Sequence, residues 1–378
     1  MRSNYKRLGN YIEEVNVRNA ELKAEELLGI NIDKYFMPSV ANVIGTDLSA
    51  YKLVKKNQFA CNRMHVGRDY RLPISMSKRD TEFMVSPAYD VFEIKDIEIL
   101  DPEYLMMWFS RKEFDRNAWF YTDADVRGGL PWKSFCDMQL PVPSITKQRE
   151  IVKEYNVIQN RFELNQKLIR KLEETAQAIY KQWFVDFEFP DENGKPYKSN
   201  GGEMVESELG EIPKGWEVDV LQKIILFKNG KSKPTHKGKY PVYGGNGIIE
   251  YVDKNNDENV IAIGRVGAYC GSLYRVLGKC WISDNAISAQ SKIDANMFSY
   301  YILYSLNLNE RSEGTGQPLI TQGLLNNIRI SIPSIELINQ FERNVSKIFV
   351  HESFLEKENQ KLSGLKDLLL SKLATINN

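Results

Sequence analysis

The pattern of apolar and polar residues repeats along the chain at long range. A short apolar stretch ends in LPVPSI at Leu140–Ile145, and a similar stretch ends in ISIPSI at Ile330–Ile335. The two prolines Pro143 and Pro333 are 190 positions apart. Each copy is followed by a long stretch without proline, in which apolar residues recur at the three- and four-residue spacing of an amphipathic helix. The pattern predicts two globular repeats, each followed by a long helix.

The similarity extends into the repeats themselves. Ala60–Met64 matches Ala262–Val266 at an offset of 202, so the first repeat has twelve more residues before the shared ending than the second. Apolar positions from Phe135 to Val142 then match those from Leu325 to Ile332 at the offset of 190. This pattern predicts duplication of the whole domain and not only of its helix.

We therefore predict an α+β protein of pseudo-twofold organisation, in which two long antiparallel coiled-coil helices separate two mixed α/β domains. Strand-like runs at 52–54 and 58–61 and a helical run at 104–109 support mixed structure in the first repeat. A bipartite partner such as duplex DNA suits an object of this kind. The predicted segments are a first domain at 1–142, a helix at 143–187, a linker at 188–208, a second domain at 209–332 and a helix at 333–375.

The two helical stretches each carry an apolar seam. Alternating steps of four and three residues run from Ile151 to Trp183 in the first helix and from Phe341 to Leu373 in the second. Antiparallel pairing of the seams makes facing residue numbers sum to 524, so Asn165 would face Asn359. Two buried amides could then satisfy one another and oppose a slipped register, although each could instead be solvated or meet a partner subunit. Helices of this length would span roughly 50 Å, about one and a half turns of duplex, and so would space the two readers.

Composition places few limits on function. With 378 residues, 42% apolar and 26% charged, the chain resembles ordinary soluble globular proteins and is long enough for two full cores. Neither a signal peptide nor an apolar run of membrane-spanning length is evident, so we expect a cytoplasmic protein without a membrane partner. The four cysteines have no C-x-x-C spacing and are expected to be reduced, with Cys270 and Cys280 buried rather than bridged. Three scattered histidines argue against a metal site.

The net charge of zero hides two basic stretches. Eight Lys and Arg residues lie between Lys52 and Arg79 against one acid, Asp69, and six lysines lie between Val220 and Ile249 with no acid. Either stretch alone could be a solvated face. Their occurrence in the same part of both repeats favours a paired phosphate-binding surface.

Arg63 and Arg265 occupy matched positions after short apolar runs. An arginine beside a backbone kept slim by glycine can bind guanine with two hydrogen bonds or a phosphate as a point contact, and the alternative is an arginine held in an ion pair. We expect replacement of each to impair recognition of its own half of a DNA site. The predicted DNA-binding residues are Lys55, Lys56, Asn62, Arg63, His65, Arg68 and Arg71 in the first repeat, and Lys228, Lys231, Lys233, Asn246, Arg265, Tyr269 and Gln317 in the second.

Motifs for catalysis are missing from the sequence. It contains no G-x-x-x-x-G-K-[ST] loop, and the glycines around 244–247 and 264–267 lack the strand and helix context of a dinucleotide site, so hairpin turns are expected there. Four acids between Asp186 and Glu192 lie in a polar connector, which we interpret as solvated. We therefore predict no catalytic and no metal-binding residues, and expect that the isolated chain neither methylates nor cleaves DNA.

Several sequence motifs stand in a fixed order along nearly the whole chain. They are Asn31–Ser39, Gly129–Trp132, Leu140–Ile145, Gln148 and Glu150 at the start of the first helix, Ala176, Ile179, Tyr180, Trp183 and Phe184 at its end, Leu209–Trp216 and Gly314–Ile320. In these motifs and their order the chain resembles the specificity (S) subunits of Type I restriction–modification systems. The first repeat departs from the pattern, because Tyr5–Leu8 stands without the Pro-Lys-Gly-Trp lead of the second.

The resemblance implies two target-recognition domains, each recognising half of a bipartite site in double-stranded DNA. It implies that the two helices, with Asn165, Asn359, Trp183 and Phe341 in their pairing, dock two methyltransferase subunits. S-adenosylmethionine would be bound by those partners and no cofactor by this chain, and motor–nuclease restriction subunits would complete the complex.

Two other functions remain open from the residues alone. One is a scaffold or coiled-coil adaptor that binds no DNA, against which the paired basic stretches argue. The other is a stand-alone DNA-modifying enzyme, against which the missing catalytic motifs argue. The recognised DNA sequence is not encoded in any motif, because it depends on loop geometry and DNA deformability.

Overall fold

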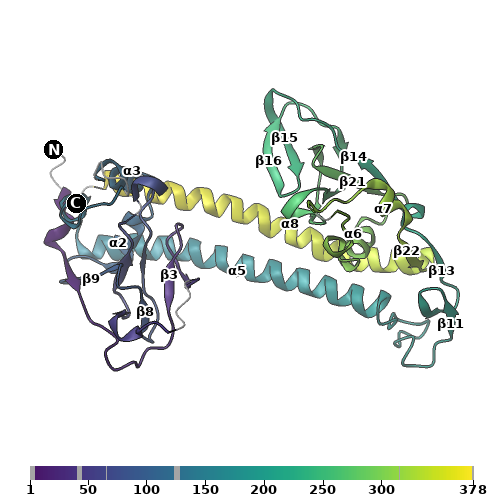
Figure 1. Ribbon diagram of the computed structural model, residues 1–378, viewed down its shortest axis with the longest axis horizontal. Helices are drawn as coiled ribbons and strands as arrows, with labels where there is room; N and C mark the ends of the chain where they lie inside the picture. Colours follow the sequence, from purple (N-terminus) through teal and green to yellow (C-terminus); the bar gives the residue numbers. More distant parts are fainter. Residues whose placement is uncertain (1–4, 41–44, 65, 123–127, 315, 377–378) are drawn as a thin grey trace. The chain divides into compact units, whose positions relative to one another are not determined.

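The computed structural model describes residues 5–40, 45–64, 66–122, 128–314 and 316–376. The chain divides into two compact units (Figure 1). Unit 1 comprises residues 1–165 and 357–378, and unit 2 comprises residues 166–356. Each unit thus combines one repeat with a part of both long helices.

Unit 1 is built on an antiparallel four-stranded sheet with the order β2-β9-β6-β7. Its core is aromatic: Phe59 and Phe92 stack at 5.0 Å between ring centroids, and Phe109 lies edge-on to both. Phe109 ends a helix that starts with a proline and an aspartate cap, Asp101, which accepts the backbone N–H of Tyr104. The main elements are β2 (Ile12–Val15), β6 (Phe59–Cys61), β7 (Ile74–Met76), β9 (Asp90–Ile94), α1 (Val66–Asp69), α2 (Pro102–Phe109), α3 (Lys112–Phe120) and α4 (Trp132–Asp137).

Three two-stranded ladders complete unit 1, namely β1 with β10, β3 with β4, and β5 with β8. The predicted strands at 52–54 and 58–61 are confirmed as β5 and β6, and the helical run at 104–109 lies in α2. The ladder strands are β1 (Tyr5–Arg7), β3 (Leu28–Ile30), β4 (Phe36–Pro38), β5 (Lys52–Val54), β8 (Phe83–Val85) and β10 (Gln139–Pro141).

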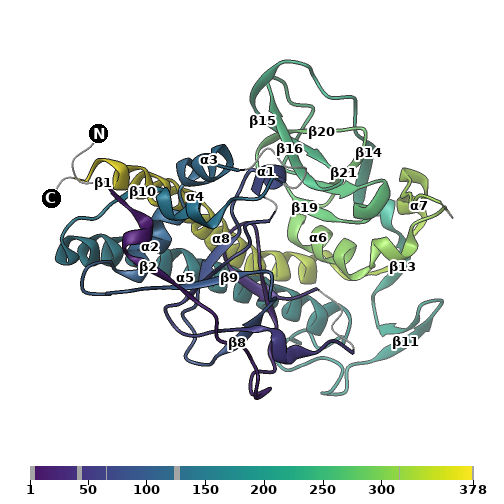
Figure 2. The same ribbon diagram turned by 60° about the vertical axis from the view of Figure 1, so that its left-hand side comes forward.

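Unit 2 contains two four-stranded sheets, ordered β14-β21-β18-β19 and β16-β15-β20-β17. Helix α6 lies beside α8 (Figures 1 and 2). Phe298 of α6 and Phe341 of α8 are in ring contact in the core. The elements are β11 (Met204–Ser207), β12 (Gly210–Pro213), β13 (Glu217–Val220), β14 (Ile225–Asn229), β15 (Lys237–Gly244), β16 (Gly247–Val252), β17 (Asp257–Glu258), β18 (Ile261–Gly264), β19 (Leu273–Arg275), β20 (Lys279–Ile282), β21 (Ala286–Ser291), α6 (Asn296–Ser305), α7 (Gln322–Asn327) and β22 (Arg329–Ile332).

The two repeats share individual hydrogen bonds, which confirms the predicted duplication. In unit 1 the Leu130 N–H donates to the Arg63 carbonyl at 2.9 Å, and in unit 2 the Ile320 N–H donates to the Arg265 carbonyl at 2.9 Å. The arginines are offset by 202 and their partners by 190, the two offsets expected from the sequence. Strand β1 likewise pairs with β10 as β13 pairs with β22, so the first repeat forms this ladder without the Pro-Lys-Gly-Trp lead.

The long helices are α5 (Ile145–Phe184) and α8 (Ile335–Lys372), within the predicted ranges. Their antiparallel register is confirmed in each unit. Asn165 Nδ2 donates to Asn359 Oδ1 at 3.0 Å in unit 1, and the rings of Trp183 and Phe341 meet edge-on at 6.0 Å in unit 2. Both pairs sum to 524. In the described part of the chain, no helix has the combined length and apolarity needed to span a membrane.

Replacing Asn165 with leucine is expected to lower the free energy of unfolding by about 1–3 kcal/mol, because it leaves the buried Asn359 amide without its partner. The double replacement Asn165→Leu, Asn359→Leu should recover most of that loss, since both polar groups are then gone. Urea unfolding of the four variants in a double-mutant cycle measures the coupling. Asn160→Leu, on an exposed position of α5, is the control and should change stability by less than about 0.5 kcal/mol. Additive single effects would contradict the pairing.

An ion-pair network in unit 2 joins β19 to both long helices. The Arg275 guanidinium donates to Glu173 of α5 at 2.9 Å and to Glu352 of α8 at 2.7 Å, and it lies over the Phe349 ring. One arginine therefore pairs with two carboxylates, and the charge of Glu356 also acts on Glu352. Burial raises the pKa of Glu352 to about 7, the effect of Glu173 and Glu356 adds to it, and Arg275 opposes it.

The network predicts that unit 2 becomes less stable as the pH rises. Folded Glu352 keeps its proton up to about pH 7, whereas the unfolded chain releases it near 4.5, so the free energy of unfolding falls between these values. Glu352→Gln removes this titration. The stability difference between the variant and the unmodified chain should therefore grow in favour of the variant from pH 4.5 to 7, as measured by urea unfolding. A difference that stays constant with pH would show that Glu352 titrates normally.

Candidate nucleic-acid interface

Four loops of unit 2 converge at one place. The hairpin tip between β15 and β16 lies against the segment after β18, because a Cβ on Gly245 would be 3.7 Å from the Val266 carbonyl oxygen and 3.8 Å from that of Asn285. The Gly267 N–H donates to the Pro318 carbonyl at 3.1 Å. Four predicted residues stand on these loops: Asn246, Arg265, Tyr269 and Gln317.

Glycine makes this convergence possible. A Cβ on Gly264 would lie 2.2 Å from the Tyr269 carbonyl oxygen, which no real side chain tolerates, and Gly267 has a φ of +74°. The expected hairpin at the β15–β16 turn is confirmed, with Gly244 paired to Gly247. The glycines therefore allow the loops to lie close together.

Arg265 is the most distinctive side chain of the interface. It is partly buried, and among the described residues its guanidinium has no ion pair and its Nε has no hydrogen-bond partner. A buried guanidinium nitrogen without an acceptor is costly, so an external acceptor would be favourable here. Guanine O6 and N7 or a phosphate are acceptors of that kind.

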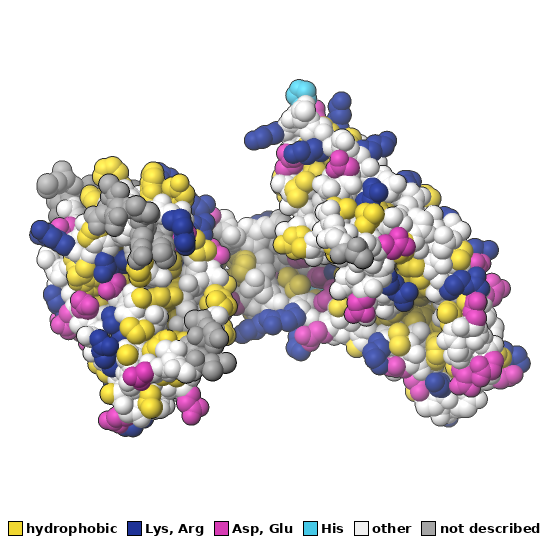
Figure 3. All heavy atoms as spheres, in the orientation of Figure 1, with side chains coloured by type: hydrophobic (Ala, Val, Ile, Leu, Met, Phe, Trp, Pro, Cys, Tyr) yellow, Lys and Arg dark blue, Asp and Glu magenta, His cyan; other side chains and the backbone are white. Residues whose placement is uncertain are grey.

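The lysines of unit 2 are only partly neutralised. Lys233 pairs with Glu250, whereas Lys228 and Lys231 have no ion pair with any residue that the structure describes. Lys231 is joined to β20 next to the loop cluster, since its N–H donates to the Ile282 carbonyl at 3.0 Å. Figure 3 shows Lys and Arg side chains, in dark blue, gathered over the end of unit 2 that carries β15 and β16.

In unit 1 most of the basic stretch is neutralised by acids that lie outside it in the sequence. All eight basic side chains between Lys52 and Arg79 have an acceptor. The pairs are Lys52 with the Tyr89 carbonyl, Lys55 with Glu82, Lys56 with Asp80, Arg63 with Asp90, Arg68 with Asp69, Arg71 with Asp33, Lys78 with Glu103 and Arg79 with Glu26. Exposed pairs of this type are worth about 0–1 kcal/mol, so a phosphate can replace most of the carboxylates.

Arg63 differs from the others because its pair is largely buried. Its side chain is 20% exposed and binds both carboxylate oxygens of Asp90, at 2.6 and 3.1 Å. It also donates to the Leu130 carbonyl and lies over the Trp132 ring. The structure thus places Arg63 in the ion pair that was the alternative to base recognition. Its role in DNA binding stays a prediction, as do those of the remaining sequence-predicted residues.

One further predicted residue of unit 1, Asn62, lies in the turn after β6. Asn62 Oδ1 accepts the Met64 N–H at 3.1 Å and so shapes the turn, and His65 lies outside the described residues. The sequence search missed the exposed aromatic residues at the end of α3. Their signal is the run Trp119-Phe120-Tyr121, in which three successive aromatic residues cannot all face one core.

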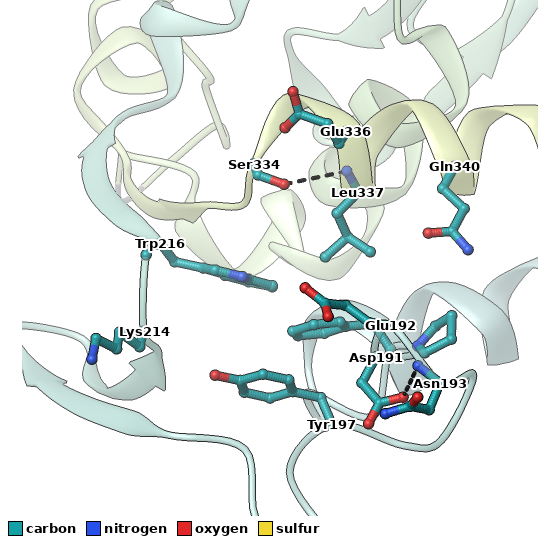
Figure 4. Close-up of a pocket in the computed structure, with 13 residues that line it drawn as sticks. Asp191, Glu192, Asn193, Tyr197, Lys214, Trp216, Ser334, Glu336, Leu337 and Gln340 are labelled. Carbon is teal, nitrogen blue, oxygen red and sulfur yellow. Dashed lines mark hydrogen bonds between the residues drawn. The ribbon is translucent and has the colours of Figure 1, made fainter.

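The acidic connector forms a turn in unit 2. Asp191 Oδ1 accepts the N–H groups of Asn193 and Lys195, both at 2.8 Å, and these bonds lower the pKa of Asp191. The connector borders a hollow of about 690 Å³ under the start of α8, where Tyr197, Trp216 and Leu337 face one another (Figure 4). Within the described residues, no group of three or more potential ligands is arranged to hold a metal ion. All four described cysteines are free thiols, with Cys270 and Cys280 buried as expected.

Comparison with known proteins finds similarity to one group of proteins. Residues 213–366 match the model of the Type I restriction modification DNA specificity domain. The specificity subunit of the HindI restriction enzyme from Haemophilus influenzae is 22% identical over 90% of this chain and 91% of its own length. That of the EcoprrI enzyme from Escherichia coli is 34% identical over 26% of this chain and 25% of its own.

A solved structure shows the same fold. The S subunit of a Type I restriction–modification system from M. genitalium aligns with 99% of this chain and 96% of its own, with a TM-score of 0.62 and 16% identity. Residues 213–366 are therefore similar to the Type I restriction modification DNA specificity domain, and most of the chain is similar to specificity subunits of Type I restriction enzymes, the family that the sequence motifs resemble.

Proposed function

We propose that the chain recognises a bipartite site in double-stranded DNA, with each unit binding one half, and positions two methyltransferase subunits on that site. The observation that carries the proposal is the loop cluster of unit 2, where Arg265, which forms no ion pair with any described residue, lies near Asn246, Tyr269 and Gln317. Arginine and amide side chains are the groups that discriminate bases in the major groove. The same hydrogen-bonded frame in unit 1 supports a second reader of the same kind.

The long helices supply surfaces for the partners. Exposed apolar side chains include Val157 and Leu164 on α5 in unit 1, and Val350 and Phe354 on α8 in unit 2. Apolar side chains that face solvent at helical spacing are suited to cover by another protein. In this proposal S-adenosylmethionine is bound by the methyltransferase subunits, motor–nuclease subunits add restriction, and the complex acts in the cytoplasm.

Methylome sequencing tests the proposal directly. Cells that lack the system receive a cognate methyltransferase subunit with or without this chain. We expect methylation only with the chain, at a motif of two specified half-sites separated by unspecified bases. Methylation at a contiguous motif, or methylation that does not depend on the chain, would contradict the proposal.

A binding experiment separates the proposal from a scaffold role. The purified complex of chain and methyltransferase is titrated onto the methylome-derived site in a gel shift with excess non-specific competitor. Specific retention is expected at a salt concentration where random DNA is released, since phosphate contacts alone weaken with salt for every sequence. A scaffold would bind the methyltransferase and show no preference for the site.

A further inference from the structure

An aromatic patch is exposed on unit 1 at the end of α3. It consists of Tyr70, Trp119, Phe120 and Tyr121, whose exposed fractions are 62, 44, 77 and 50%. Exposed aromatic residues standing singly are common, but four from two adjoining segments form an apolar surface that needs a partner. Neither the helix seam nor the predicted DNA-binding residues account for it.

The patch rests on a rigid base. The opposite face of α3 is buried through Phe114, Asp115 and Ala118. Asp115 Oδ1 accepts from Lys34 Nζ at 2.7 Å and from the Leu72 N–H at 3.1 Å. These contacts fix α3 against the core of unit 1, so the side chains at its exposed end have a rigid support.

Tyr70 is held beside Trp119 at the expense of backbone strain. Its φ is +57°, a left-handed conformation that bulky residues rarely adopt, and its ring centroid is 5.4 Å from that of Trp119. Strain of this kind persists where the surrounding structure enforces it, often at binding sites. The Tyr70 N–H closes α1 by donating to the Val66 carbonyl at 2.9 Å.

The patch adjoins the segment of unit 1 that corresponds to the Arg265 loop of unit 2. Helix α1 packs on α3 and begins three residues after Arg63. Its Gly67 N–H donates to the Gly128 carbonyl at 2.7 Å, and a Cβ on Gly67 would lie 2.7 Å from the Gly128 Cα. This close approach of two backbones fixes α1 beside the shared frame, and with it the position of the patch.

The charges around the patch favour a nucleic acid as its occupant. Lys112 and Arg116 are exposed on α3 and have no ion pair with any described residue. Arg68 and Arg71 flank Tyr70 in exposed pairs that a phosphate can replace. An apolar patch with cations on the same two helical segments matches the stacked bases and the phosphates of a duplex.

We infer that Phe120 is a wedge that inserts between base pairs in the half-site bound by unit 1, with Trp119 and Tyr70 as its support. This inference rests on the proposed function and adds DNA deformation to it. Apolar side chains that enter a base step unstack it and bend the duplex, and the wider contact offsets the unstacking. Recognition of this half-site would then depend on how easily the wedged step opens.

Fluorescence of 2-aminopurine placed at successive steps of the first half-site tests the wedge, because unstacking raises its emission. The full complex of chain and methyltransferase is used. We expect one step to brighten with the unmodified chain, no brightening with Phe120→Ala, and a five- to tenfold higher Kd for that variant. Phe120→Leu should keep the brightening, because leucine also acts as a wedge. Tyr35→Ala, another exposed aromatic position of unit 1, is the matched control and should behave as the unmodified chain.

The outcomes separate this inference from the proposed function. Specific binding by the unmodified chain together with unchanged Kd and emission for Phe120→Ala would overturn the wedge alone. Failure of the Phe120→Ala complex to assemble, measured by co-elution, would also overturn it in favour of a protein contact. Loss of specificity in the unmodified chain itself would overturn the proposed function, and the wedge with it.

Discussion

Replacement of Arg63 with alanine is expected to lower the free energy of unfolding of unit 1 by about 3 kcal/mol. The substitution leaves the Asp90 carboxylate, 16% exposed, without its bidentate partner. It also removes the donor to the Leu130 carbonyl and the cation over the Trp132 ring. These two contacts join the segment after β6 to the start of α4. Urea unfolding followed by tryptophan fluorescence measures the loss, since Trp132 lies at the broken contact.

Arg71→Ala is the matched control for this experiment. Arg71 lies in the same basic stretch and pairs with Asp33, but both side chains are about half exposed or more, so the change should be below about 1 kcal/mol. Equal losses for the two variants would show that the Arg63–Asp90 pair is no stronger than a surface pair. A stable Arg63→Ala variant that loses the first half-site would show that Arg63 leaves Asp90 to bind DNA.

Arg265→Ala is expected to do the reverse, with little effect on stability and a large one on DNA. No ion pair within the described residues is broken, and a buried nitrogen without a partner is removed. Loss of a base-contacting arginine costs about 1–3 kcal/mol, so the Kd for the target should rise roughly ten- to hundredfold. Binding to a panel of sites with changes in either half should show relaxed discrimination in the second half only.

Lys228→Ala and Arg265→Lys distinguish a phosphate contact from base recognition. Lys228 stands on β14 without an ion pair in the described structure, so its loss should weaken binding to all sequences alike and reduce the salt dependence. Lysine at 265 keeps the charge but not the paired donors, so a phosphate contact would survive it and guanine recognition would not. Weakening of both halves by Arg265→Ala would identify Arg265 as a phosphate contact.

The repeat and the helix register could be predicted because both depend on spacing along the sequence. Offsets of 202 and 190 located the shared hydrogen bonds. The constant sum of facing residue numbers in the antiparallel seams located the pair of Asn165 and Asn359. Seams are periodic, and a buried asparagine in an apolar seam has few ways to be satisfied. Both predictions thus come from comparing two similar stretches of the sequence.

The charge state of the first basic stretch could not be predicted in this way. Its neutralising acids include Glu26, Asp33 and Glu103, which come from other segments of the sequence and meet the stretch only through the tertiary fold. The two repeats therefore share a frame but not an electrostatic surface. The exposed aromatic residues at the end of α3 could not be predicted for a related reason. Whether an aromatic run is exposed depends on which of its faces the core covers.

The division of the chain between the units has a consequence for its synthesis. Unit 2 is continuous, from 166 to 356, whereas unit 1 combines residues that precede and follow unit 2: Leu373 belongs to the same buried cluster as Ile151 and Val152, and the Tyr5 hydroxyl donates to the Ala374 carbonyl at 3.0 Å. During synthesis, all residues of unit 2 are therefore available before those of unit 1, although unit 1 begins first. The N-terminal repeat waits, with part of its core uncovered, until the last helix emerges, and it is the part of the nascent chain most exposed to misfolding.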